Sequence, residues 1–162
     1  MRALKRLGVM VTVLLIFQAA GVRAGYGPDG AGNLGAGLML GSPTGATFKY
    51  WLDRKTAVDT GIGWGVDGGL TLVADYLWHD FSAFSFQNNP SLDKQLAFYI
   101  GPGVRIRIDD DHVFGLRGVM GASYLFPKNP FELYAEIVPV LVLVDHPTGS
   151  LDGGIGFRYY FR

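Results

Sequence analysis

The 162-residue chain contains no cysteine. An exported chain of this size therefore lacks a disulfide framework, and its fold needs another constraint. Beyond the first residues the sequence shows no helical periodicity. It also has no excess of basic residues, since 14 Lys and Arg face 14 Asp and Glu. Nothing in it resembles the basic footprint of a nucleic-acid-binding protein.

The first 24 residues have the organisation of a secretory signal peptide. Arg2, Lys5 and Arg6 form a positive segment, residues 9–17 are apolar, and Val22-Arg23-Ala24 approximates a small-x-Ala cleavage site. A membrane anchor is the alternative, but the apolar run is well short of the roughly 20 residues that a spanning helix needs. Removal of 1–24 takes away four basic residues, and 14 − 4 leaves 10 basic against 14 acidic. We therefore expect a mildly acidic mature chain, with a flexible Gly-rich lead at 25–32 and one domain at 33–162.

Eight segments of that domain predict β-strands. They lie at about 33–41, 45–52, 56–66, 69–81, 95–108, 112–125, 131–144 and 150–162. The connections contain residues that start or tighten turns, such as Ser42-Pro43-Thr44-Gly45 and Pro127-Lys128-Asn129-Pro130. Pro102 and Pro139 fall inside two strands, and we expect β-bulges there because proline cannot donate to the ladder.

Apolar and charged residues alternate along these segments. The outward face is predicted to carry Phe48, Tyr50, Leu52, Val58, Ile62, Trp64, Leu70, Leu72, Tyr76, Trp78, Phe98, Ile100, Val104, Ile106, Phe114, Leu116, Met120, Leu133, Ile137, Leu141 and Leu143. The inward face is predicted to carry Lys49, Asp59, Asp75, Arg105, Arg107, Arg117, Glu132, Glu136 and Arg158. Charges opposite an apolar face are typical of a transmembrane β-barrel. A soluble barrel would invert the arrangement.

The inward charges have both signs. An eight-stranded barrel has an interior that side chains fill, and a buried charge is too costly without a partner. We therefore expect a salt-bridged network and no continuous pore. The predicted network contains Lys49, Arg105, Arg117 and Arg158 with Asp59, Asp75, Glu132 and Glu136. Inward glycines, among them Gly103 and Gly121, would make room for the long arginines. Trp51, Trp64 and Trp78 lie near strand ends and are expected to be interfacial anchors.

These features resemble the small eight-stranded outer-membrane barrels, the OmpX/OmpA transmembrane class. The resemblance rests on the signal peptide, the eight alternating strands, Tyr and Trp at strand ends, and aromatic residues at alternate positions in 156–161. It implies an all-β, eight-stranded antiparallel transmembrane barrel in the outer membrane of a Gram-negative-type envelope. It also implies contact with outer-membrane lipid and with the barrel-assembly machinery, which would read the last strand, although here Arg162 follows Phe161.

A structural or surface-interaction role without cofactor, metal or catalytic residues is the favoured interpretation. Some barrels of this size modify lipids, so a second hypothesis is a hydrolase with His146 as base, Thr148 or Ser150 as nucleophile, and Asp109–Asp111 as orienter. With both termini in the periplasm, His112 and His146 fall at the outer rim and His79 near the inner one. The run Asp109-Asp110-Asp111-His112 suggests a cation site, but a solvated hairpin tip explains it better. A third hypothesis, a soluble lipocalin-like ligand binder, conflicts with the charged inward face.

Overall fold

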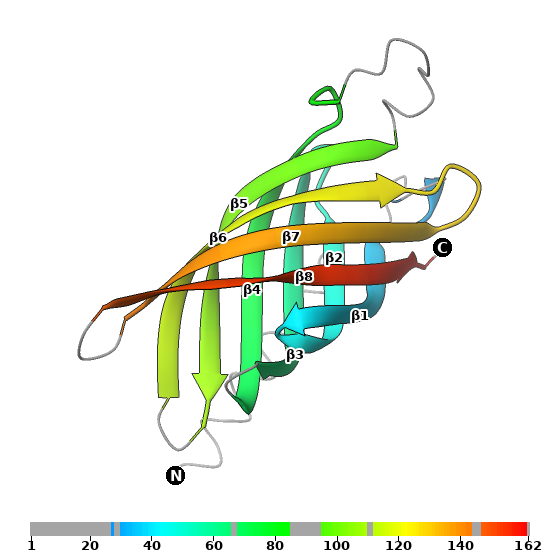
Figure 1. The fold of residues 1–162 in the computed structure, drawn as a ribbon. Coiled ribbons are helices and arrows are strands. Elements are labelled where there is room, and N and C mark those ends of the chain that lie inside the picture. The colour runs from blue at the N-terminus through cyan, green and yellow to red at the C-terminus, as the bar shows by residue number, and fades with distance from the viewer. Residues whose placement is uncertain are drawn as a thin grey trace.

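The computed structural model describes residues 27, 30–65, 68–84, 95–109, 112–143 and 147–161. They form a closed antiparallel barrel in which the eight strands follow chain order (Figure 1). The strands are β1 (Leu34–Ser42), β2 (Thr44–Trp51), β3 (Thr56–Gly65), β4 (Gly68–Asp80), β5 (Leu96–Ile108), β6 (His112–Leu125), β7 (Phe131–Val142) and β8 (Thr148–Tyr160). The all-β, eight-stranded prediction is confirmed, and each strand end lies within two residues of its expected position. Among the described residues, no helix is long and apolar enough to cross a membrane.

The barrel has two distinct ends. At one, which we call the terminal end, the start of β1 meets the end of β8, because Phe161 N donates to Leu34 O at 2.9 Å. The β6–β7 connection lies there too, since Tyr160 N donates to Pro130 O at 2.7 Å. Figure 1 shows β8 finishing beside that connection. The opposite end, which we call the hairpin end, carries the connections that follow β1, β3, β5 and β7.

Residues just before β1 contact the terminal end. Gly32 N donates to Phe161 O at 2.7 Å, and Ala31 is fully buried against the barrel. Ala31 packs in a cluster with Trp51, Ala57, Leu125 and Tyr160, and this cluster fills the interior near the terminal end. The predicted signal peptide at 1–24 lies outside the described residues, as does half of the predicted lead at 25–32.

The alternation of the strands places apolar side chains on the outside of the barrel. The predicted outward residues are all half-buried or exposed, and several of the most exposed side chains in the molecule are leucines, with Leu38 at 68% and Leu151 at 71%. Trp64 and Trp78 also face outward, at 65% and 49%. Trp51 does not. It is 1% exposed, because it shares the inward parity of Lys49 on β2, so its predicted role as an interfacial anchor is wrong.

The β-bulges predicted at Pro102 and Pro139 are also wrong. The pairing of β5 with β6 and of β7 with β8 continues through Pro102↔Gly118 and Pro139↔Leu151 without a register shift. On the other side of each proline the ladder omits two pairs and then resumes in the same register. Each proline therefore gives up pairing on one side only and inserts no extra residue. The register shift that the structure does contain lies at Trp64/Gly65, between β3 and β4.

Candidate functional site in the barrel interior

The predicted network residues come from seven neighbouring strands. Lys49 lies on β2, Asp59 on β3, Asp75 on β4, Arg105 on β5, Arg117 on β6, Glu132 and Glu136 on β7, and Arg158 on β8. All are buried except Glu136, which is partly exposed. The structure brings them together in three groups along the barrel axis rather than in one continuous network.

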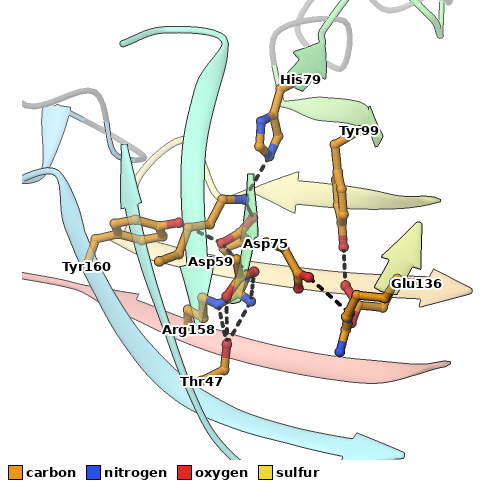
Figure 2. A network of polar contacts seen from close by, with 11 residues as sticks. Thr47, Asp59, Asp75, His79, Tyr99, Glu136, Arg158 and Tyr160 are labelled. Carbon is orange, nitrogen blue, oxygen red and sulfur yellow. Dashed lines mark hydrogen bonds and ion pairs between the residues drawn. The ribbon is translucent and has the colours of Figure 1, made fainter. Parts of the chain in front are cut away.

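The first group, near the terminal end, is centred on Glu132. Lys49 Nζ donates to Glu132 Oε1 at 2.7 Å, and Tyr160 OH donates to Oε2 at 2.7 Å. Arg158 pairs with both Glu132 and Asp59 and donates through Nη2 to Thr47 Oγ1 at 2.8 Å (Figure 2). The guanidinium also stacks over the ring of Tyr134 at 3.8 Å from its centroid. Each charge of this group therefore meets an opposite charge, which offsets the cost of burial.

The second group contains Asp75, Arg117 and Glu136, and its arginine offsets a charge repulsion that the strand register creates. Asp59 and Asp75 are directly opposite each other on β3 and β4, and like charges in that position destabilise a sheet. Arg158 binds the first carboxylate, and Arg117 Nε lies 3.0 Å from Oδ1 of the second. Each of the two acids is thus neutralised by its own arginine, from β8 and β6 respectively.

Glycines on the strands between these partners leave space in which the long side chains can meet. Gly103 on β5 lies between Arg117 and Asp75, and a Cβ at Gly103 would come within 1.7 Å of Asp75 Oδ1. The room predicted for arginines is taken at this position by the Asp75 carboxylate, which Arg117 contacts. At Gly121 the room is used by Tyr99, whose hydroxyl donates to Glu136 Oε2 at 3.1 Å. Arg117 Nη2 lies 3.5 Å from the other Glu136 oxygen and links Glu136 to Asp75.

The third group lies nearer the hairpin end. Arg105 Nη1 donates to Asp152 Oδ2 at 2.5 Å, and Ser42 Oγ donates to Asp152 Oδ1 at 3.2 Å. Asp152 was not among the predicted network residues. Its position could have been read from the sequence, because it shares inward parity with Arg158 on the same strand.

His79 is the second interior residue that sequence reasoning missed. It belongs to the terminal end, as expected, but its ring is buried inside the barrel, with Nε2 2.9 Å from Lys49 Nζ. The ring lies 4.4 Å from Trp51 and 5.1 Å from Tyr99, between centroids. Its inward parity with Asp75 on β4 was the available signal. The ring nitrogens of His79 contact Lys49 Nζ and, at 3.2 Å, the backbone oxygen of Lys55, so within the described part of the chain they bond neither a Ser or Thr hydroxyl nor a carboxylate.

A void of about 10 Å³ lies among Thr47, Asp59, Asp75, Arg117 and Glu136, and that is about the space of one water molecule. Within the described ranges, no three His, Cys, Asp or Glu side chains are arranged to hold a metal ion. Of the proposed outer-rim residues, His112 and Asp109 are exposed, whereas Asp110, Asp111 and His146 lie outside the described residues.

Comparison with known structures identifies the architecture. The chain is similar to the crystal structure of the N-terminal β-barrel domain of Pseudomonas aeruginosa OprF, with a TM-score of 0.53 and 19% sequence identity. The match covers 80% of this chain and 98% of that domain. This chain has the fold of a small eight-stranded barrel. No protein-family model matches it, and no curated protein matches its sequence.

Proposed function

We propose that this chain is an integral outer-membrane protein whose barrel spans the bilayer, with the terminal end toward the periplasm. The observation that carries the proposal is the polarity of the wall. Leucine, isoleucine, phenylalanine and tryptophan side chains are exposed around the outside, whereas Lys49, Glu132 and Arg158 are buried within. A soluble protein rarely exposes a continuous apolar surface of this kind. In a bilayer the same surface is favourable, since it would contact acyl chains while the charges stay inside. A basic residue facing the membrane midplane would cost about 2–4 kcal/mol.

Export and assembly complete the proposal. The predicted signal peptide at 1–24 would direct the chain across the inner membrane. The last strand would be read by the barrel-assembly machinery, and its exposed outward row of Phe157, Tyr159 and Phe161 supports this. Phe131 packs against the first two of these rings, at 5.0 and 5.4 Å between centroids.

The role we propose is structural or surface-interacting, without a continuous pore. Three features support a closed lumen: the apolar cluster around Trp51 and Tyr160, the paired charges around Glu132 and Arg117, and the Arg105–Asp152 bridge. A lipocalin-like binder would need an apolar lumen, which these charges do not provide. A lipid-modifying enzyme would need a histidine beside a nucleophile, and His79 instead contacts Lys49 and two aromatic rings.

Envelope fractionation combined with gel mobility tests the proposal. The mature chain should be recovered with the outer membrane, and its mobility should change on boiling, because a closed barrel resists detergent until it is heated. Purified protein in planar bilayers should give no sustained conductance. Recovery in the soluble periplasm without detergent would contradict the membrane assignment. Reproducible single-channel steps would contradict the closed lumen while leaving the membrane assignment intact.

A further inference from the structure

An apolar hollow of about 520 Å³ lies on the outward face of the barrel wall, centred on β6 and β7 and lined also by residues of β5, β8 and β1. Its floor contains Ala122 and Ala135, which are opposite each other in the register. The next outward row toward the terminal end contains the bulky residues Tyr124, Leu133 and Phe157. Two small side chains beside a row of large ones therefore make a recess in the outer wall. Its volume is in the range of small-molecule sites, about 300–1,000 Å³.

The hollow has a polar group on its lining toward the terminal end, and a positive charge lies beyond it in the chain connection at that end. Tyr124 OH donates to Gln95 Oε1 at 2.8 Å, which places a hydroxyl and an amide there. Lys128 is exposed in the short connection between β6 and β7, the two strands that supply the floor. It makes no ion pair within the described part of the chain. A cation beyond the end of an apolar recess is complementary to a molecule with an apolar chain and an anionic head.

We propose that the hollow holds one acyl chain of an anionic glycerophospholipid from the leaflet at the terminal end, with the phosphate near Lys128. This inference rests on the proposed function, because the outward face meets lipid only if the barrel spans a membrane. It adds a specific lipid site to a surface that would otherwise contact lipid without preference. The floor alanines would determine occupancy, and Lys128 would determine the preference for an anionic head.

Native mass spectrometry tests the proposal. The mature protein is reconstituted in bilayers of equal phosphatidylglycerol and phosphatidylcholine, released, and scored for retained lipid. The parent protein should retain one phosphatidylglycerol. Ala135→Phe should fill the hollow and lower retention about ten-fold, a change equivalent to the loss of one decade in affinity. Ala74→Phe is the matched control, since Ala74 also faces outward, on β4, and does not line the hollow. Ala122→Leu gives a second test if Ala135→Phe does not fold.

Lys128→Gln should abolish the preference for phosphatidylglycerol while phosphatidylcholine is still retained. Lys55→Gln, in the β2–β3 connection at the same end, should keep the preference. Equal retention in the parent, Ala135→Phe and Ala74→Phe would overturn the site, and so would equal loss in both variants. An unchanged preference in Lys128→Gln would overturn the charged contact. A heat-modifiable barrel that retains no phospholipid contradicts this proposal alone, whereas a chain that does not enter bilayers contradicts the proposed function as well.

Discussion

Near the terminal end, the Glu132 carboxylate accepts hydrogen bonds from Lys49, Arg158 and Tyr160. Nearer the hairpin end, the Asp152 carboxylate accepts hydrogen bonds from Arg105 and Ser42. The difference extends to the donors. Arg158 uses Nε, Nη1 and Nη2, but Arg105 Nε and Arg117 Nη1 make no hydrogen bond within the described part of the chain. Charges of the same kind thus share a network near the terminal end. Arg117 bridges two carboxylates, and toward the hairpin end Arg105 forms a single bridge with Asp152.

This contrast indicates that the two halves of the interior tolerate amino-acid substitution to different degrees. A group bonded to several partners cannot be removed without leaving several charges unsatisfied. An isolated bridge leaves one. We therefore expect the half near Glu132 to contribute most to the stability of the closed barrel, and the half near Asp152 to accept substitution more readily.

The largest effect is expected from Glu132→Ala. It leaves Lys49 and Arg158 without their shared carboxylate, and breaking a buried pair costs about 3–5 kcal/mol. Asp152→Ala should cost less, because one cation loses its partner instead of two. Urea unfolding of refolded protein in detergent measures both values, with Lys128→Ala in an exposed turn expected within about 0.5 kcal/mol of the parent. Equal losses for Glu132→Ala and Asp152→Ala would remove the distinction between the halves.

A smaller effect is expected when both partners of a bridge are replaced. Arg105→Leu combined with Asp152→Leu should change the free energy of unfolding little or raise it, since apolar replacement of a buried pair is often neutral or stabilising. Lys49→Leu combined with Glu132→Leu should still destabilise, because Arg158 and Tyr160 lose an acceptor. The same urea titration compares the two double variants. If the Arg105–Asp152 double variant is destabilised as much as the Lys49–Glu132 double variant, the charge pairs of the two halves contribute equally to stability.

The sequence could predict the strands and faces because alternation has a fixed period of two. It could not predict which charges meet across the lumen. Lys49 is opposite Asp59 in the register, yet its ammonium reaches Glu132 on β7. Such contacts depend on the stagger of the closed barrel, which a linear pattern does not contain. Trp51 was misassigned for a different reason, because its position at a strand end was weighed above its inward parity.

The smallest effect in this series is expected at the surface, in the β2–β3 turn. Asp53 accepts hydrogen bonds from the backbone N–H of Lys55 and from the backbone N–H and hydroxyl of Thr56. The Thr56 hydroxyl, followed by the two backbone donors, lowers the pKa of the Asp53 carboxyl below its ordinary value. A lowered folded-state pKa gives stability that is present above the unfolded pKa of about 3.9 and is lost as the pH falls through the folded value.

Asp53→Ala should therefore lower the urea midpoint slightly at neutral pH, and the difference from the parent should disappear in strong acid. Measuring both proteins across that range checks the sign of the effect. A difference that grows as the pH falls would contradict the hydrogen-bonded carboxylate. Because Asp53 is fully exposed, the change should be smaller than any of those in the barrel interior.

The central claim is that the apolar outside of the wall faces lipid while the inside does not, and the three tryptophans report on it directly. Two variants, each keeping only Trp51 or only Trp78 with the other tryptophans changed to Phe, are inserted into bilayers that contain brominated acyl chains. The account predicts strong quenching of Trp78, which is 49% exposed on the outer face, and little quenching of Trp51, which is 1% exposed inside the barrel. Equal quenching of the two, or stronger quenching of Trp51, would contradict it.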